Sequence, residues 1–254
     1  MKICTPESSH ISQLRKLWQE SFSDTEFFVN VFFQTAFSQK RSRCVICDEQ
    51  IAAALYWFSC TWGDMRLAYL YAVATAGEFR GRGICRRLME DTHAHLKELG
   101  YDAVILVPGS DSLFGFYERM GYRVCSSIRE LNCKSADGGV MMERIDKHAY
   151  GKLRRMYLPE NGVLQEAENL DLLECTEEFY QGEDFLLAGH CENGEYVGVE
   201  LLGNVVKTPQ ILHSLGCETG VFRTTGEERP FAMCFPLRAE SVISDMYFGI
   251  AFDL

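Results

Sequence analysis

The feature that most constrains the fold is a change of pattern from strand to loop, helix and strand in the first half of the chain. The pattern of Met65–Ala74 predicts a strand, and a loop of glycines and arginines follows over residues 77–83. Residues 84–99 have the apolar spacing of a helix, and Ala103–Val107 is an unbroken apolar run, typical of a buried strand. The segment is therefore predicted to be a β-loop-α-β unit whose loop opens a helix.

A loop of this composition is suited to binding an anion. Backbone N–H groups at the start of a helix point in one direction, and the helix dipole adds partial positive charge there. Gly81 and Gly83 let the backbone approach a ligand closely. Arginines crowd the same place, although the whole chain has a formal net charge of −11: Arg80, Arg82, Arg86 and Arg87. This local inversion of charge indicates a phosphate-binding loop, and a glycine turn with a solvated basic face is the alternative.

Two common nucleotide-binding patterns do not fit this loop. The dinucleotide fingerprint needs a third glycine where Arg86 stands, and a Walker loop needs the sequence Gly-Lys-Ser/Thr, which is absent. The strand before the loop also closes a predicted antiparallel meander, whose earlier strands are residues 43–47 and 51–62. A strand in such a meander fits neither nucleotide-binding fold.

The composition narrows the class of protein. Hydrophobic residues make up 47% and charged residues 24%, as in a soluble globular chain, and the acidic surface disfavours nucleic acid as a partner. The 11 cysteines are scattered and odd in number, so we interpret them as reduced, and Cys44 and Cys47 have the spacing of a zinc ligand pair without a second pair. We predict no metal site. The start of the chain does not resemble a signal peptide, and no apolar run is long enough to cross a membrane, so we expect a cytoplasmic protein.

The remaining pattern predicts two parts. Around the unit we expect helices beginning at Ser8 or Ser9, at Asp24 and at Leu113, and a strand over Tyr122–Ser126. The polar, glycine-containing stretch Arg129–Val140 is the predicted linker. Beyond it we expect helices over residues 144–157, 170–180 and 209–215, and strands over residues 185–190, 196–202, 221–224, 230–236 and 247–252.

Two motifs in this order resemble the GCN5-related N-acetyltransferase (GNAT) superfamily. They are the loop Arg80-x-x-Gly83-x-Cys85 and the segment from Gly115 to Tyr122, which contains Tyr117. The resemblance implies an α/β (α+β) protein with a mixed, mostly antiparallel sheet flanked by helices. It implies an acetyl-CoA-binding catalytic GNAT domain over residues 1–132. Residues 141–254 resemble the degenerate GNAT-like half of two-part acetyltransferases, and a sterol-carrier-like domain is the alternative.

The resemblance also implies roles for particular residues. The backbone of the loop would bind the CoA pyrophosphate, through Arg80, Gly81, Arg82, Gly83, Ile84 and Cys85. The backbone of Ala72 and Val73 would bind the thioester carbonyl or pantetheine where the two central strands part, Ser110 would contact pantetheine, and Tyr117 would be the general acid. Two positions depart from the family pattern: Cys85 replaces a smaller residue, and Ser110 stands where many members have Asn.

The predicted activity is that of an acyltransferase: direct transfer of an acetyl group from acetyl-CoA to an amine of a small molecule or peptide. Tyr69 and Tyr71 share a strand face that could line the acceptor site, and Glu78 or Asp111 could act as a base through water. His93 and His95 are interpreted as structural or solvent-facing. The cysteines suggest an acyl-cysteine intermediate, but none has a His partner in the sequence, so direct transfer is favoured. A non-catalytic CoA-binding protein is the competing function, and a homodimer is a further expectation.

Overall fold

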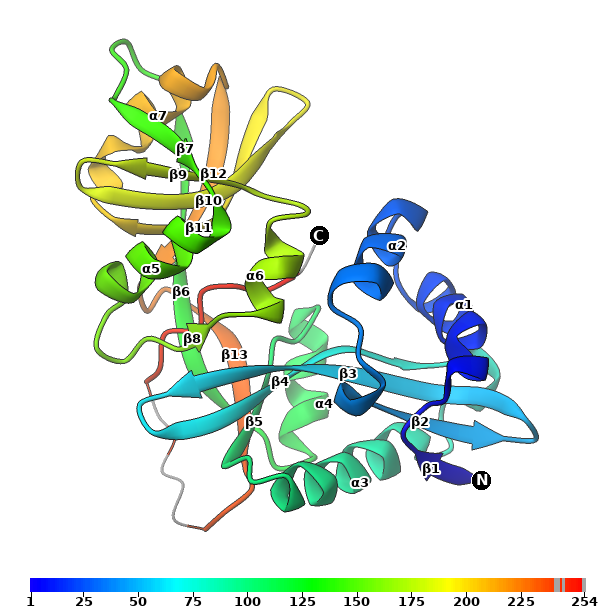
Figure 1. Ribbon diagram of the computed structural model, residues 1–254. Helices are drawn as coiled ribbons and strands as arrows, with labels where there is room; N and C mark the ends of the chain where they lie inside the picture. Colours follow the sequence, from blue (N-terminus) through cyan, green and yellow to red (C-terminus); the bar gives the residue numbers. More distant parts are fainter. Residues whose placement is uncertain (240–242, 244, 253–254) are drawn as a thin grey trace. The chain divides into compact units, whose positions relative to one another are not determined.

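The computed structural model describes residues 1–239, 243 and 245–252. Contacts between residues divide the chain into two compact units, whose elements are labelled in Figure 1. Unit 1 contains residues 1–123 with residues 233–239 and 243, and unit 2 contains residues 124–232 with residues 245–252.

Unit 1 is a mixed sheet with helices on both faces. Its strands are β1 (Lys2–Cys4), β2 (Ser42–Cys47), β3 (Gln50–Trp62), β4 (Met65–Thr75), β5 (Ala103–Leu106) and the second half of β13 (Arg229–Pro236). Its helices are α1 (Ile11–Ser21), α2 (Glu26–Thr35), α3 (Ile84–Glu98) and α4 (Asp111–Glu118), with 3-10 turns η1 (Ser8–His10), η2 (Gln39–Arg41) and η3 (Gly77–Phe79). The strand order is β1-β2-β3-β4-β5-β13, and β4 and β5 are its one parallel pair among the described residues.

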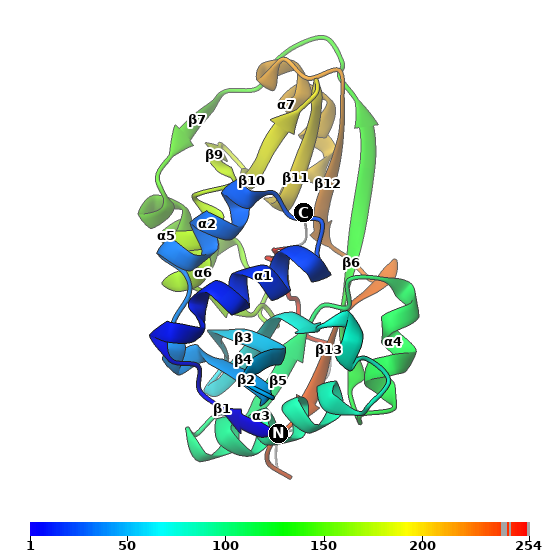
Figure 2. The same cartoon turned by 90° about the vertical axis from the view of Figure 1, so that its right-hand side faces the viewer.

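The two faces of this sheet are covered by different helices. Figure 2 shows α1 and α2 over one face and α3 over the other. The core under α3 contains apolar side chains from the helix, such as Leu88 and Leu96, and from β4 and β5. The start of α2 lies two residues later than predicted, because the Thr25 hydroxyl caps the Phe28 N–H while Asp24 accepts a 2.6 Å hydrogen bond from the Trp18 indole.

Unit 2 has a similar set of elements. Its strands are β6 (Arg123–Lys134), β7 (Met142–Ile145), β8 (Leu164–Gln165), β9 (Glu178–Gly182), β10 (Phe185–Glu192), β11 (Glu195–Gly203), β12 (Thr219–Thr225) and the first half of β13. Its helices are α5 (Lys147–Tyr157), α6 (Glu168–Leu173), α7 (Thr208–Leu215) and the 3-10 turn η4 (Val205–Lys207). The strand order is β7-β9-β10-β11-β12-β6, with β11 and β12 parallel and the other neighbours antiparallel.

The two units repeat one topology. In each, three antiparallel steps lead to a central strand, a helical connection follows, and the next strand lies parallel to the central one. An antiparallel strand then completes the sheet: β13 next to β5 in unit 1, and β6 next to β12 in unit 2. The predicted fold class, a mixed and mostly antiparallel sheet flanked by helices, is confirmed.

The division of the chain differs from the predicted one. β6 continues to Lys134, so residues 129–134 are part of a strand and not of a linker. The chain passes from unit 1 to unit 2 at residues 123 and 124, before the predicted boundary at residue 132, and it returns to unit 1 at Met233. The physical reason is that the β5 edge needs a partner, and the apolar half of β13 supplies it through the pairs Met233↔Leu106 to Pro236↔Ala103.

Three other predictions in the second part need correction. The helix expected over residues 170–180 ends at Leu173, and Glu178 begins strand β9. The helix expected from residue 144 begins at Lys147, because Asp146 caps it and the preceding residues form β7. The strand expected over residues 247–252 is reduced to a single bridge between Tyr247 and Gly162. The hairpin formed by β10 and β11 is confirmed.

Candidate active site

The loop between β4 and α3 has a backbone that only glycine adopts easily. Gly81 has φ +73° and Gly83 has φ +72°, both left-handed. A Cβ placed on either residue would meet no atom within 4 Å, so the space beside both residues is open. Gly83 is also the residue that precedes the first turn of α3. The loop therefore combines a backbone shape that requires glycine with free space for a ligand.

Most N–H groups at the end of this loop and in the first turn of α3 have no acceptor among the described residues. The Arg80 N–H bonds to the Gly77 carbonyl at 3.3 Å, and the Arg87 N–H bonds to the Gly83 carbonyl at 3.2 Å. No protein acceptor is found for the N–H groups of residues 81–86, and no side chain caps the helix. These donors lie at the positive end of a helix of 15 residues, an arrangement that suits a phosphate group.

The arginines of the loop partly serve to hold its shape. Nε of Arg80 donates to the Thr75 carbonyl at 2.9 Å, and the Arg82 guanidinium lies 5.5 Å from the centre of the Phe79 ring. Arg86 donates to the carbonyl of Arg119 at 3.2 Å. Within the described residues, none of the loop arginines forms an ion pair with a carboxylate, so their positive charge is not neutralised.

Strand β4 is irregular next to the loop. Its pairing with β5 ends at Leu70 and Leu106, as the predicted parting of the central strands requires. On the β3 side, Tyr71 pairs with Tyr56 and Ala74 with Ala54, so Ala72 and Val73 bulge from the ladder. Ala72 has φ +47°, an unusual value for a residue with a side chain. The bulge therefore lies at the residues predicted to bind the thioester.

Tyr117 lies near the carboxyl end of α4. Gly121, with φ +94°, ends this helix, and the Tyr122 N–H bonds to the Tyr117 carbonyl at 3.1 Å while the Gly121 N–H bonds to the Glu118 carbonyl at 2.9 Å. The Tyr117 side chain is 7% exposed, and its ring packs against the Tyr122 ring at 5.7 Å. Burial, together with the nearby Cys85 thiol, raises the pKa of Tyr117 well above its ordinary value, so its hydroxyl is protonated at neutral pH.

The two residues that depart from the family pattern lie in different surroundings. Cys85 is half-buried on the first turn of α3, and burial raises the pKa of its thiol to about 11, which the hydrogen bond from Thr75 only partly offsets. A thiol with such a pKa is a poor nucleophile at neutral pH. Ser110 is exposed at the start of α4, where its Oγ lies 2.9 Å from the Oγ of Ser112.

The part of the chain with this geometry matches a known family. Residues 2–125 match the family described as an acetyltransferase (GNAT) domain. These residues form a GNAT acetyltransferase domain.

Several known proteins are similar to this chain. "Uncharacterized N-acetyltransferase YesJ" of Bacillus subtilis (strain 168) is 32% identical over 87 residues, which cover 30% of this chain and 48% of YesJ. The match thus spans about half the length of that relative. A GCN5-related N-acetyltransferase from Anabaena variabilis has a TM-score of 0.72 at 14% identity, covering 93% of this chain and 73% of its own. A GCN5-related N-acetyltransferase from Kribbella flavida has a TM-score of 0.69 at 16% identity, and the match covers 93% of this chain and 72% of that protein. At these identities the similarity concerns the fold.

The face of the GNAT domain sheet under α1 and α2 is aromatic. The ring of Tyr71 lies 5.6 Å from that of Trp18 and 5.9 Å from that of Phe32, and Tyr69 stacks on Phe58 at 5.9 Å. Tyr69 is buried and Tyr71 is half-buried. The two tyrosines predicted to line the acceptor site thus share one face, as expected, within this aromatic cluster.

The carboxylates considered as bases lie on exposed short elements. Glu78 belongs to the 3-10 turn η3, directly before the loop, and Asp111 is the first residue of α4. Neither side chain accepts a hydrogen bond that would fix it from another described residue. Their positions allow a base that acts through water and do not distinguish one residue from the other.

Sequence reasoning missed the surroundings of His93. The sequence indicates a structural or solvent-facing residue, and the structure gives the structural environment: Nε2 lies 2.6 Å from the Tyr122 hydroxyl, and the ring stacks on Phe235 at 4.3 Å. A histidine at this helix position, followed later by a tyrosine next to a helix-ending glycine, is too common a pattern to be recognised without the fold. Its contacts with the Tyr117 segment depend on how α3 and α4 pack.

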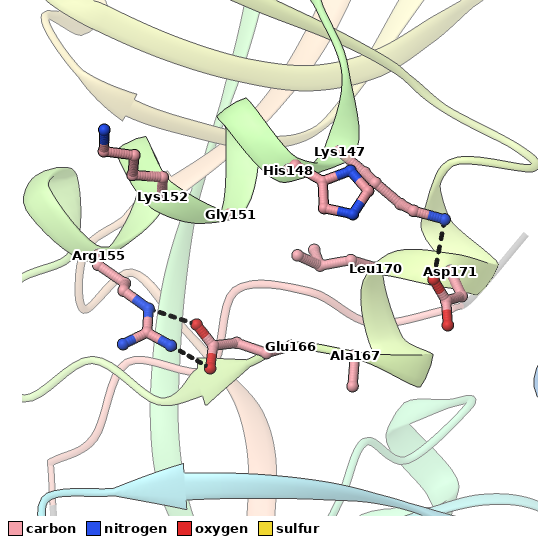
Figure 3. A pocket seen from close by; sticks show the side chains of 9 residues that line it. All are labelled: Lys147, His148, Gly151, Lys152, Arg155, Glu166, Ala167, Leu170 and Asp171. Carbon is pink, nitrogen blue, oxygen red and sulfur yellow. Dashed lines mark hydrogen bonds and ion pairs between the residues drawn. The ribbon is translucent and has the colours of Figure 1, made fainter.

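A pocket of about 490 Å³ lies in unit 2 and contains none of the predicted site residues. Figure 3 shows that its charged side chains largely pair with one another. Arg155 binds Glu166 at 2.5 and 2.6 Å, and Lys147 binds Asp171 at 2.9 Å. The charges of Arg155 and Lys147 are therefore already matched, unlike the N–H groups of the loop before α3.

Among the described residues, no helix is both long enough and apolar enough to cross a membrane.

Proposed function

We propose that this protein is an N-acetyltransferase that transfers an acetyl group from acetyl-CoA directly to an amine of a small molecule or peptide. The observation that carries the proposal is the loop before α3, with two left-handed glycines, open space beside them and unpaired N–H groups over residues 81–86. Acetyl-CoA as the cosubstrate is consistent with the match to an acetyltransferase domain. Acetyl-CoA supplies an activated acetyl thioester, and the chain positions it.

The loop fits the pyrophosphate of CoA. Residues 81–86 offer donors at the helix start, and the guanidinium groups of Arg82 and Arg86 add unneutralised positive charge nearby. Arg80 is proposed to act through its backbone, since its side chain binds the Thr75 carbonyl. Ser110, exposed at the start of α4, is proposed to contact pantetheine.

The bulge at Ala72 and Val73 is proposed to bind the thioester. Because β5 makes no ladder pair with β4 beyond Leu70, the backbone there is not committed to a neighbouring strand on that side. An N–H group directed at the thioester oxygen would stabilise the negative charge that develops there as the amine attacks.

Tyr117 is proposed to be the general acid. As the amine nitrogen forms a bond to the acetyl carbon, the carbon–sulfur bond breaks and the sulfur takes a proton. The amine must be neutral to attack, and its proton goes to water or a water-relayed base. A buried, protonated Tyr117 hydroxyl is in the state that donates to a leaving thiolate. The raised pKa of Cys85 favours this direct route over an acyl-cysteine intermediate.

Calorimetry with acetyl-CoA tests the cofactor site. Gly83→Ala places a Cβ at φ +72° and in the open space beside the loop, and should raise the Kd for acetyl-CoA about tenfold. The matched control is Gly100→Ala, at φ +82° after the other end of the same helix, which strains the backbone without touching the loop. If the parent does not bind acetyl-CoA at millimolar concentration, the proposal is wrong.

Turnover over a panel of amines tests the chemistry. Tyr117→Phe should lower kcat about a hundredfold while acetyl-CoA still binds. Tyr101→Phe is the matched control, because Tyr101 is also buried but its hydroxyl bonds to Ser59 at 2.7 Å. A parent that binds acetyl-CoA and acetylates no amine would favour a non-catalytic CoA-binding protein, which the exposed Ser110 and the absence of a fixed base also suggest.

We further propose that unit 2 is a degenerate GNAT-like domain. The repeated strand order and the parallel pair β11 and β12 support this over a sterol-carrier-like domain. A cytoplasmic location and a homodimer remain predictions. Sedimentation of the full chain tests the dimer, and the odd number and the scatter of the eleven cysteines, which suggest reduced thiols, are consistent with the location.

A further inference from the structure

A buried hydrogen bond joins α3 to the residue after the Tyr117 helix. Nε2 of His93 lies 2.6 Å from the hydroxyl of Tyr122, and Tyr122 is 1% exposed. Burial lowers the pKa of His93 to about 4 and raises that of Tyr122 well above its usual range, so both groups are neutral at neutral pH. No other acceptor is found for the Tyr122 hydroxyl among the described residues. Its hydrogen therefore points to Nε2, and His93 carries its proton on Nδ1.

Tyr122 is coupled to Tyr117 through both backbone and ring. The Tyr122 N–H bonds to the Tyr117 carbonyl at 3.1 Å, and the two rings meet at 62° with their centres 5.7 Å apart. A shift of the Tyr122 ring therefore displaces one wall of the space that holds Tyr117. The hydrogen bond to His93 resists this shift.

Strand β13, which returns the chain to unit 1, packs against both His93 and Tyr122. Phe235 of β13 stacks on His93 at 4.3 Å with 22° between the rings, and it contacts Tyr122 at 5.5 Å. Its ring also lies 3.0 Å from where a Cβ on Gly121 would be, so there is no room for a side chain at that position. His93, Tyr122 and Phe235 thus form a packed group that contacts Tyr117 through the Tyr122 ring.

We propose that His93 and Tyr122 are positioning residues, which hold the Tyr117 hydroxyl where it can protonate the leaving thiolate. This inference rests on the proposed function. It assigns to α3 a second task, separate from its amino-terminal loop: the start of the helix binds phosphate, and its middle orients the acid. The two tasks predict different kinetic consequences.

Removing the acceptor tests the inference. His93→Leu leaves the buried Tyr122 hydroxyl without a partner. It should lower kcat about tenfold, because a small misplacement of a reacting group slows the reaction strongly. The KM for acetyl-CoA should be unchanged, because the loop before α3 is intact. His93→Gln keeps an oxygen acceptor near the position of Nε2 and should restore most of kcat. Tyr122→Phe removes the hydroxyl and keeps the ring, and should resemble His93→Leu.

The matched control is His95→Leu. His95 lies on the same helix, but its ring faces Trp57 at 6.1 Å, so kcat should be unchanged. ¹⁵N NMR of the imidazole in the folded parent should show the Nδ1–H tautomer of His93, and that signature is independent of activity. Melting temperatures of all variants establish that they are folded under the assay conditions.

The outcomes separate the two proposals. If Tyr117→Phe abolishes transfer while His93→Leu and Tyr122→Phe, both folded, keep the parental kcat, the positioning role is wrong and the acid remains. An Nε2–H tautomer, or a failure of His93→Gln to restore kcat, also contradicts the positioning role. If Tyr117→Phe has no effect on transfer, the proposed acid is wrong, and the inference falls with it.

Discussion

The two units share a topology but treat the connection after the central strand differently. In unit 1, β4 leads through left-handed glycines to α3, whose first N–H groups are unpaired. In unit 2, β11 leads to α7 through a loop whose polar groups already have partners within the protein. The Asn204 side chain caps the Val206 N–H, and Lys207 binds Asp184 at 2.7 Å. Pro209 in the first turn of α7 removes one more donor. An anion site therefore depends on the chemistry of the loop and not on the topology that surrounds it.

The bulges of the central strands show the same contrast. In β4 the bulged residues Ala72 and Val73 have small or medium apolar side chains. In β11 the corresponding irregularity lies at Val199. The next residue, Glu200, is fully buried, and its carboxylate binds Arg154 at 2.6 and 2.9 Å and Tyr150 at 2.7 Å. A buried ion pair therefore adjoins the bulge of unit 2, whereas the residues at the bulge of unit 1 are apolar.

The largest expected effect comes from separating the units. A chain that ends at Asn132, the predicted domain boundary, lacks β13 and leaves the β5 edge unpaired, without Met233 and Leu237 in the core under α3. We expect this fragment to lose the cooperative thermal transition of the full chain, as followed by circular dichroism. A fragment that melts cooperatively and binds acetyl-CoA would show that unit 1 does not need the returning strand.

Glu200→Ala tests the buried ion pair between Arg154 and Glu200 in unit 2. It leaves the Arg154 guanidinium buried without its partner and should lower the free energy of unfolding by about 3–5 kcal/mol. Glu195→Ala, at an exposed position on the same strand, is the control and should have little effect. Urea titration followed by fluorescence measures both. A loss for Glu200→Ala no larger than that of the control would contradict the role of this pair in the packing of unit 2.

Lowering the pH is expected to have a smaller effect on the free energy of unfolding, and this effect should arise from His93 in unit 1. Because burial lowers the pKa of His93 to about 4, the unfolded chain binds a proton there at a higher pH than the folded chain does. This contribution to stability is complete above the unfolded pKa near 6.5 and is lost as the pH falls toward 4, by about 2 kcal/mol between pH 7 and pH 5.

Thermal unfolding of the parent and of His93→Gln at pH 7 and pH 5 measures the contribution of His93 to the pH dependence of stability. The variant cannot take up the proton, so its stability should fall less over the same interval. Equal pH dependence in the two proteins would mean that His93 is not the group responsible.

Much of unit 1 could be predicted from local pattern. The meander, the helix after Gly83 and the strand β5 follow from alternation, glycine positions and apolar runs, which depend on neighbours in the sequence. In contrast, residues 129–134 are polar enough to indicate a linker, yet they pair with β12 through contacts such as Leu131↔Phe222. Sheet partners so distant in sequence leave no local signal, which explains both the misplaced boundary and the helix wrongly expected over residues 170–180.

The sequence by itself determined the conformation of the loop that we propose binds the anion, because the left-handed glycines, the helix start and the arginines act over a few residues. It also determined that Tyr117 would lie on a helix ended by Gly121. Only the tertiary structure decided what surrounds the neighbouring Tyr122. His93 comes from another helix, and Phe235 comes from a strand that follows most of unit 2 in the sequence. The physical reason is that backbone conformation follows from nearby residues, whereas the surroundings of a buried side chain depend on which distant segments pack against it.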